Sequence, residues 1–210
     1  MFKTIWYFLL LVVIAAMVLV GALMTGCSDS DDTSELTITP SPSPTVTDEP
    51  SNPVVIMKTN YGDITIELFE DKVPVTVGNF VHLVKDGFYS DVVFHRISDD
   101  FMIQAGVLSV DETQKISPYG PINLEIHPEV RHIDGTISMA RTNDPNSATG
   151  QFFICDGPQP FLDDSYAAFG VVIEGIEVVR EIAAQPHDNS NPAGGGVPLS
   201  TILIESIKLK

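Results

Sequence analysis

Hydrophobic and polar residues alternate along much of the chain after residue 54, a pattern typical of β-strands with one buried face. Ile64, Ile66 and Leu68 are separated by polar residues, and the apolar run at 54–57 precedes the turn signal Asn-Tyr-Gly-Asp at 60–63. These two segments are predicted to form a β-hairpin. Further short strands are predicted at residues 92–97, 101–104, 135–140, 151–155, 167–172 and 201–209.

Two segments instead show the spacing of an amphipathic helix. Pro74 suits the first turn of a helix, and the apolar residues at positions 77, 80, 81 and 84 then share one face. Gly87 is expected to end this helix. Apolar residues at positions 176, 179 and 183 predict a second helix near 175–184. Many strands with two helices predict a mainly β domain, a closed antiparallel barrel with the helices over its openings.

The first 26 residues have the composition of a membrane segment. Lys3 precedes residues 5–24, which carry no charged side chain, and a helix of that length is about 30 Å long, enough to cross a bilayer. The segment ends in Met24-Thr25-Gly26-Cys27, which resembles a lipoprotein signal that is cleaved before a lipidated Cys27. The alternative is an uncleaved transmembrane anchor with an incidental cysteine. Both interpretations place the rest of the chain outside the cytoplasm, tethered to a membrane.

Residues 27–53 are predicted to be a disordered linker, because Ser, Pro and Asp dominate and little apolar surface offsets the entropy of ordering. Its prolines favour an extended spacer that holds the domain away from the membrane. The composition becomes globular at Val54, so residues 54–210 are predicted to form one domain with a hydrophobic core. We expect a monomer, because the hydrophobic pattern is complete within this domain.

The chain of 210 residues has 11 Lys and Arg against 28 Asp and Glu, a formal net charge of −17. This balance argues against nucleic acid as a partner, because phosphate binding needs clustered cations. It also argues against docking on anionic lipid through a basic face. The two cysteines, Cys27 and Cys155, are too few for a disulfide framework. Cys155 follows a hydrophobic run and is expected to be a buried apolar side chain.

Motifs for nucleophilic, phosphate-binding or metal-dependent chemistry are absent: the sequence has no Gly-x-Ser-x-Gly, P-loop, Cys-x-x-Cys or His-Glu-x-x-His. His127 and His132 lie near Glu125 and Glu129, but the proline at 128 interrupts any helix that could align them. We interpret these residues as a polar surface loop without a metal. His187 lies in a loop rich in Gly, Pro and Asn, where nothing supports a catalytic triad. No metal and no cofactor are predicted.

A set of ordered motifs stands out instead, combining arginine with aromatic residues and Met. They are Phe94-His95-Arg96, Phe-Met-Ile-Gln at 101–104, Ser-Met-Ala-Arg-Thr at 138–142 and Gln-Phe-Phe-Ile at 151–154. In this order and spacing, over residues 54–210, they resemble the cyclophilin family of peptidyl-prolyl cis-trans isomerases, most of all its short bacterial or archaeal members. The resemblance implies an eight-stranded antiparallel barrel capped by two α-helices, in agreement with the periodicity.

The resemblance also implies a site. Arg96 matches the catalytic arginine, His95 is its supporting neighbour, and Gln104 matches the side chain that holds the substrate backbone. Substrate binding is implied for residues of the proline pocket, the adjacent strand and the rim: Phe101, Met102, Gln104, Ala140, Arg141, Gln151, Phe153, Phe161, Leu162 and Tyr166. Phe161 replaces a tryptophan of many eukaryotic members, and Tyr166 a histidine. The missing indole N–H implies weak or no cyclosporin binding.

The sequence therefore predicts an enzyme that binds proline-containing polypeptides outside the cytoplasm and accelerates X–Pro isomerisation as they fold. Arg96 would donate a hydrogen bond to the nitrogen of the twisted amide, over an apolar pocket that grips the proline ring. A second hypothesis is a binding module with the same pocket, in which catalysis is incidental; the intact Arg96 and Gln104 favour the enzyme. A third, a purely structural surface lipoprotein, leaves the pocket residues unexplained.

We predict that Cys27 is lipid-modified, because small residues precede it and a soluble spacer follows it. Mass spectrometry of the protein extracted from membranes should show a mature chain that starts at a lipid-modified Cys27. A mature chain that still starts at Met1 would contradict the lipoprotein interpretation and leave the plain anchor.

Overall fold

The structure, a computed structural model, describes residues 52–210. The apolar segment 5–24, Cys27 and the linker up to residue 51 lie outside the described residues. The elements in chain order are β1 (Val54–Thr59), β2 (Gly62–Leu68), α1 (Pro74–Lys85), β3 (Val92–Val93), β4 (Arg96–Ser98), β5 (Met102–Ala105), β6 (Thr136–Met139), β7 (Phe152–Cys155), the 3-10 turn η1 (Pro160–Leu162), β8 (Ala168–Glu174), α2 (Ile176–Ala183) and β9 (Leu203–Leu209). Neither α-helix of this part of the chain is long and apolar enough to cross a membrane.

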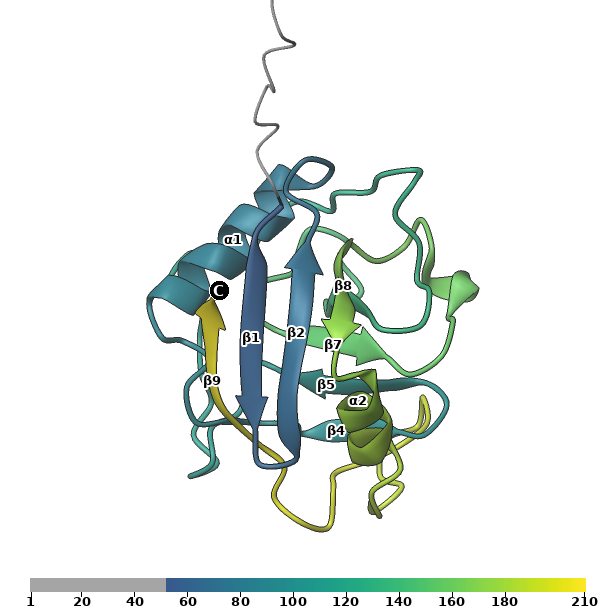
Figure 1. Cartoon of the computed structure of the whole chain (residues 1–210). Helices are drawn as coiled ribbons and strands as arrows, with labels where there is room; N and C mark the ends of the chain where they lie inside the picture. Colours follow the sequence, from purple (N-terminus) through teal and green to yellow (C-terminus); the bar gives the residue numbers. More distant parts are fainter. Residues whose placement is uncertain (1–51) are drawn as a thin grey trace, which may run out of the picture. The chain divides into compact units, whose positions relative to one another are not determined.

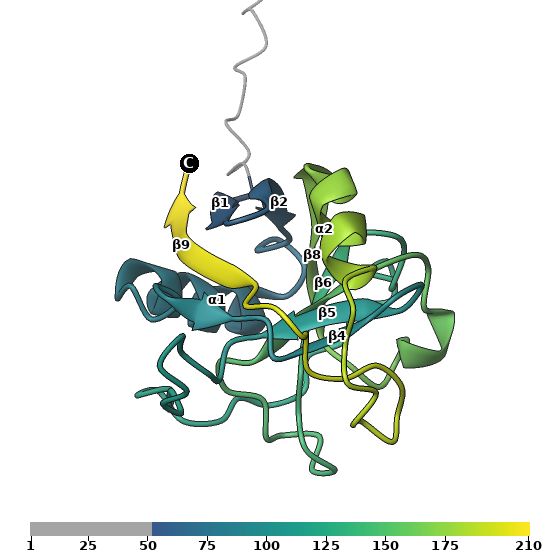
Figure 2. The same cartoon turned by 90° about the horizontal axis from the view of Figure 1, so that it is seen from below.

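The predicted mainly β architecture with two helices is confirmed. The nine strands within residues 52–210 form one antiparallel sheet in the order β3-β9-β1-β2-β8-β6-β7-β5-β4, and the sheet curls around a core (Figures 1 and 2). β1 and β2 form the predicted hairpin, paired from Val54 opposite Glu67 to Thr59 opposite Gly62. β9 pairs with β1, so the last strand of the chain lies beside the first.

The strand predicted at 92–97 is interrupted at Phe94 and His95, and its two halves join opposite edges of the sheet. β3 pairs with β9, whereas β4 pairs with β5 at the other end of the strand order. The Phe94 N–H donates to Ile202 O on the β9 side, and the His95 N–H donates to Gln104 O on the β5 side. Because Phe94 and His95 alone connect β3 at one edge of the sheet to β4 at the other, the sheet must curl until the two edges lie close together. Counted as one strand, β3 and β4 complete the predicted eight.

The inward face of the sheet is marked by a row of isoleucines in register across four neighbouring strands. Ile97 of β4 lies opposite Ile103 of β5. Ile154 of β7 lies opposite both Ile103 and Ile137 of β6. All of these side chains are fully buried in the main hydrophobic core. Because side chains alternate between faces along a strand, the residues that flank each isoleucine lie on the outer face of the sheet.

Helix α1 begins at Pro74 as predicted, and a carboxylate from a distant segment caps it. Val73, the residue before the helix, makes no side-chain cap. Glu125 instead accepts hydrogen bonds from the Thr76 N–H at 2.8 Å and the Val75 N–H at 3.3 Å. These contacts satisfy backbone donors that the first turn leaves free, and they place a negative charge at the positive end of the helix.

Both helices bury their apolar faces in the same core. α1 packs against β9 and contributes Val77 and Phe80, and α2 packs against β2, β4 and β5 and contributes Val179 and Ile182. The two helices lie on different sides of the curled sheet (Figures 1 and 2). The two helices therefore cover the core at two separate places. They leave the outer surface of β4, β5, β7 and β6 uncovered.

The first two described residues are hydrogen-bonded to the domain. Pro53 O accepts the Leu68 N–H at 2.8 Å. The Asn52 side chain donates to Glu67 Oε1 at 3.2 Å and accepts the Asp71 N–H at 3.3 Å. These bonds attach Asn52 and Pro53 to β2 and to the turn after it.

We expect residues 52–210 to fold alone as a monomer. A chain cut at Val54 should also fold but be less stable by about 0.5–1.5 kcal/mol, because the Leu68 N–H loses its acceptor. Sedimentation velocity and thermal melts on both truncations measure this. A stable dimer, or two truncations with the same melting temperature, would contradict the expectation.

Candidate active site

The outer face of the same four strands carries the residues that the motifs singled out. Arg96 of β4 lies opposite Gln104 of β5, and Gln104 lies opposite Phe153 of β7. Phe153 in turn lies opposite Ser138 of β6. This row is offset by one residue from the isoleucine row. Strand alternation therefore brings a cation, an amide and an aromatic ring side by side on the outside of the sheet.

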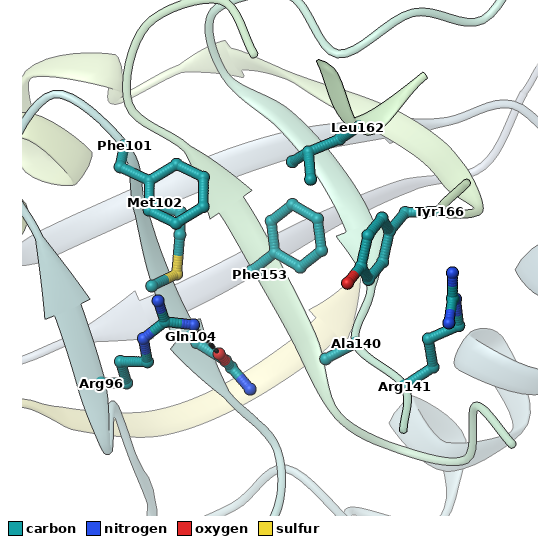
Figure 3. A pocket seen from close by; sticks show the side chains of 9 residues that line it. All are labelled: Arg96, Phe101, Met102, Gln104, Ala140, Arg141, Phe153, Leu162 and Tyr166. Carbon is teal, nitrogen blue, oxygen red and sulfur yellow. Dashed lines mark hydrogen bonds between the residues drawn. The ribbon is translucent and has the colours of Figure 1, made fainter. Parts of the chain in front are cut away.

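A pocket of about 150 Å³ opens on this row (Figure 3). Its floor is formed by the apolar side chains of Met102, Phe153 and Leu162. Each of them is 7% exposed or less. With Cys155, which is buried as predicted, they form a hydrophobic cluster of their own, separate from the main core. The structure brings the following sequence-predicted residues together around this pocket: Arg96, Phe101, Met102, Gln104, Ala140, Arg141, Phe153, Leu162 and Tyr166.

Arg96 lies at one side of the pocket and is held by neutral oxygen acceptors. Its Nε donates to Gly194 O at 3.2 Å, and its Nη2 donates to Gly194 O at 2.9 Å and to Ala193 O at 3.2 Å. Its Nη1 donates to Gln104 Oε1 at 3.4 Å. Cζ of Arg96 lies 5.7 Å from the centroid of the Phe101 ring. These contacts fix the plane of the guanidinium beside the pocket.

The two carbonyls, of Ala193 and Gly194, belong to a loop for which the sequence motifs predict no role. Gly196 exchanges two backbone hydrogen bonds of 3.0 Å with Ile97 of β4, which draws the loop against the strand. Gly195 has a φ of +73°, and a Cβ there would lie 2.0 Å from Ile97 O. Glycine is required for so close an approach of two backbones. The glycine run at 194–196 is the signal that could have identified this contact.

No carboxylate within residues 52–210 forms an ion pair with Arg96 or with Arg141, the two arginines of the pocket. Burial lowers the pKa of Arg96, while the nearby Tyr166 raises it. A guanidinium nevertheless remains protonated at neutral pH. Two cations without carboxylate partners therefore line the pocket of a strongly acidic chain.

The opposite rim is formed by Arg141 and Tyr166. Cζ of Arg141 lies 4.6 Å from the centroid of the Tyr166 ring, and the guanidinium donates to the carbonyls of Ser165 and Thr142. The Tyr166 ring packs edge-on against Phe153, with centroids 5.9 Å apart. Arg96 and Arg141 therefore stand on either side of Phe153 (Figure 3).

Comparison with known proteins identifies the family. The family model described as "Cyclophilin type peptidyl-prolyl cis-trans isomerase/CLD" matches residues 54–209. The chain belongs to the cyclophilin-type peptidyl-prolyl cis-trans isomerases. The match spans the whole sheet, from β1 to β9, and includes every residue of the pocket.

Relatives of this cyclophilin agree. Peptidyl-prolyl cis-trans isomerase A of Dickeya dadantii is 41% identical over 160 residues, which cover 74% of this chain and 83% of that protein. Peptidyl-prolyl cis-trans isomerase B of Escherichia coli is 38% identical over 162 residues, which cover 73% and 98%. A crystal structure of a cyclophilin from Cryptosporidium parvum, obtained in the presence of the dipeptide Ala-Pro, matches with a TM-score of 0.65 and 30% identity, and covers 75% of this chain and 98% of that chain. The predicted family and enzyme class are confirmed.

Three predicted site residues lie beside the cyclophilin pocket instead of lining it. Gln151 accepts a hydrogen bond of 3.1 Å from Gln104 and so orients that amide. Phe161 is 67% exposed on η1 and borders an adjoining groove. His95 lines another groove next to Arg96, and its buried Nδ1 has no hydrogen-bond partner among residues 52–210. Burial, followed by the charge of Arg96, lowers the pKa of His95.

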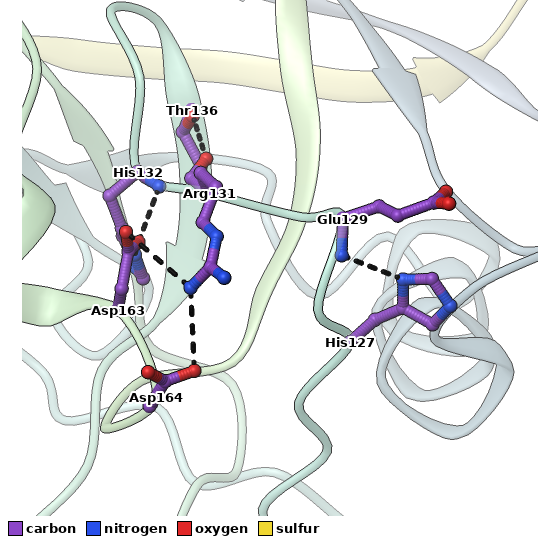
Figure 4. Close-up of polar contacts among 7 residues, drawn as sticks. All are labelled: His127, Glu129, Arg131, His132, Thr136, Asp163 and Asp164. Atoms are coloured by element: carbon purple, nitrogen blue, oxygen red, sulfur yellow. Dashed lines mark hydrogen bonds and ion pairs between the residues drawn. The ribbon is translucent and has the colours of Figure 1, made fainter. Parts of the chain in front are cut away.

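The interpretation of His132 as part of a polar surface loop was wrong. Its side chain is 1% exposed, and its ring nitrogens lie 2.9 Å from Asp163 Oδ1 and 3.0 Å from Ser138 Oγ. His132 contacts Asp163 (Figure 4), and Asp163 directly follows Leu162 of the cyclophilin pocket. Periodicity carried no signal for these contacts, because the two partners lie 31 and 6 residues away.

The other polar residues of that segment also have structural partners. Glu125 caps α1, and Glu129 forms an ion pair of 3.1 Å with Lys72. His127 Nδ1 accepts the Glu129 N–H at 3.3 Å (Figure 4). Each of these groups therefore has a structural contact of its own, and these contacts do not gather the groups around one point.

A different acidic group is the one place within residues 52–210 where three candidate ligands for a cation lie together. Oxygens of Asp99, Asp100 and Asp156 are within 4.8 Å of one another. Asp156 Oδ2 accepts the Asp100 N–H at 3.0 Å, which gives this carboxylate a role in the β4–β5 turn. We assign no ligand to the group.

Proposed function

We propose that this isomerase accelerates X–Pro isomerisation in proteins that fold outside the cytoplasm, with Arg96 stabilising the twisted amide. The observation that carries the mechanism is the environment of the Arg96 guanidinium. It borders an apolar pocket and is oriented by neutral acceptors. No ion pair in the described part of the chain neutralises it.

The chemistry requires one positioned donor. Rotation about a prolyl amide meets a barrier of about 18–20 kcal/mol, because it destroys the partial double bond between carbon and nitrogen. In the twisted state the nitrogen lone pair is localised and accepts a hydrogen bond that the planar amide accepts only weakly. A donor aimed at this nitrogen therefore binds the transition state more tightly than the ground state, which is the requirement for catalysis. Arg96 suits this role because its charge is permanent and its donors lie in one rigid plane.

The apolar floor would bind the proline ring. Met102, Phe153 and Leu162 offer no polar group, and a ring bound against them would exclude water. Exclusion of water lowers the local dielectric constant and so strengthens the hydrogen bond from Arg96. Gln104, held between Arg96 and Gln151, would hold the substrate backbone. The Cryptosporidium parvum structure obtained in the presence of Ala-Pro supports a prolyl peptide as the substrate class.

The location outside the cytoplasm is proposed from the sequence before residue 54. An apolar segment at 5–24, a cysteine after small residues and a Pro-rich spacer are the features of a tethered extracytoplasmic protein. Substrates would be secreted or surface proteins, in which slow X–Pro isomerisation limits folding. A lipid-modified Cys27, measured as described above, would support this part of the proposal, whereas a mature chain that starts at Met1 would leave the plain anchor as the tether.

Arg96→Ala should reduce kcat/KM by about one to three decades, on the order of 1.4–4 kcal/mol of transition-state stabilisation. The loss should fall mainly on kcat, because the donor acts on the twisted amide. Arg96→Lys should restore little activity, because a flexible ammonium cannot reproduce the planar set of donors. An isomerase assay on a tetrapeptide with one X–Pro bond, together with thermal melts, measures these effects.

Arg180 provides the matched control. It forms an ion pair with Asp134 outside the pocket, so Arg180→Ala should keep wild-type activity. Phe153→Ala removes a pocket wall and should raise KM and lower the melting temperature. Full activity in a folded Arg96→Ala variant would refute the catalytic assignment and make a binding module the better description.

Position 161 should control inhibition by cyclosporin. The Phe161 ring is exposed at the rim but offers no N–H donor. Phe161→Trp should therefore tighten inhibition by about two- to tenfold, the effect of one net hydrogen bond. Inhibition curves for the wild type and the variant measure the change. The same inhibition constant in both forms would show that another position decides.

A further inference from the structure

His132 is a buried histidine whose ring has a partner at each nitrogen. Its Nδ1 lies 2.9 Å from Asp163 Oδ1, and its Nε2 lies 3.0 Å from Ser138 Oγ. An ionised carboxylate can only accept, so Nδ1 carries a proton and donates a hydrogen bond to Asp163. In the neutral ring, Nε2 accepts a hydrogen bond from the Ser138 hydroxyl, and both nitrogens are satisfied.

This chain of hydrogen bonds connects two walls of the pocket. The His132 ring lies nearly parallel to the Phe153 ring, with centroids 6.1 Å apart and an interplanar angle of 12°. The His132 N–H donates to Asp163 Oδ1 at 2.8 Å, and His132 O accepts the Gln159 N–H at 2.8 Å. The turn at 159–163, which carries Leu162, is therefore attached to His132 at both ends. Neither contact depends on the pairing of β-strands.

A serine, a histidine and a carboxylate in sequence are also the elements of a hydrolytic triad. Here Ser138 is fully buried and lies within β6, opposite Phe153. A nucleophile must be reached by its substrate, and no surface of this serine is open. Ser138, His132 and Asp163 therefore do not form a hydrolytic triad.

We propose that His132 is a positioning residue of the isomerase, which through Ser138 and Asp163 sets the pocket walls formed by Phe153 and Leu162. This inference rests on the proposed function, since it assigns the pocket to the prolyl ring. His132 does not touch the substrate. It holds the ring of Phe153 in one orientation and holds Leu162 at one distance from it.

The charges around His132 favour the neutral ring. Burial lowers the pKa of His132, and the hydrogen bond and charge of Asp163 raise it by less. Arg131 lies 3.8 Å from Asp163 and 3.4 Å from Asp164, and so offsets the negative charge on that side (Figure 4). The Cys155 thiol of β7 stays neutral, since burial raises its pKa to about 12. The buried cluster at the pocket therefore holds its geometry without a net charge on the imidazole.

The lowered pKa of His132 makes the stability of the domain depend on pH. The folded-state pKa of His132 is below its unfolded value of about 6.5, so the unfolded chain binds more protons as the pH falls. The stability that the neutral ring provides is complete above about pH 6.5 and is lost as the pH falls through the lowered pKa. A protonated Nε2 would also require the Ser138 hydroxyl to turn from donor to acceptor.

The test compares His132→Asn, Ser138→Ala and Asp163→Asn with the wild type, all as the full chain in detergent. Pocket walls bind the proline ring in the ground state and the transition state alike, so their displacement should raise KM and leave kcat nearly unchanged. We expect KM to rise about three- to tenfold in each variant. The fall in unfolding free energy between pH 7 and pH 5 should also be smaller in His132→Asn than in the wild type. His127→Gln, a change of a histidine in the same segment outside the pocket, is the matched control and should alter neither quantity.

The outcomes separate this inference from the proposed function. An inactive wild type would refute the proposed function. An active wild type with unchanged KM in folded His132→Asn and Ser138→Ala variants would refute only the positioning role and leave His132 a structural residue. A fall in kcat at constant KM would likewise overturn it. Ser138→Ala removes a single oxygen, so it keeps the test valid if His132→Asn does not fold.

Discussion

The register of β4, β5, β7 and β6 is the constraint on which both the core and the pocket depend. One row of paired residues, which includes Ile97 and Ile154, points inward, and the row offset by one residue, which includes Arg96 and Phe153, points outward. A slip of one residue would bury a guanidinium and expose the isoleucines, which costs far more than a fold with a few kcal/mol of net stability can lose. The packing of the core therefore determines which side chains form the pocket.

The pocket differs from an ordinary surface pocket in how its cation is held. Arg96 is oriented by carbonyl and amide oxygens, which accept hydrogen bonds without neutralising its charge. A carboxylate in the same place would orient the guanidinium equally well but would compete with the substrate for it. Neutral acceptors therefore combine a fixed geometry with an available charge, which is the condition for electrostatic stabilisation of a transition state. The glycine loop at 194–196 makes this possible by its close approach to β4.

The pocket floor is a small hydrophobic cluster outside the barrel, and it requires supports of its own. Strand pairing supports Met102 and Phe153, because both lie within the sheet. Leu162 lies in a turn, and its support is the attachment of residues 159–163 to His132. The proposed positioning role of His132 thus follows from the position of Leu162 outside the sheet. There no strand pairing holds the backbone, and hydrogen bonds to His132 take its place.

The sequence by itself determined the hairpin, both helices, the order of the strands along the chain and, through its ordered motifs, the family and the residues around the pocket. Periodicity could predict the strands and helices because the face of a strand or a helix is a local property. The tertiary structure decided the rest. It placed Phe94 and His95 between the two edges of the sheet, Glu125 on the first turn of a helix 49 residues earlier, and His132 in a buried site. These contacts join residues far apart in sequence, and no local spacing records them, because only the curled sheet brings their partners together.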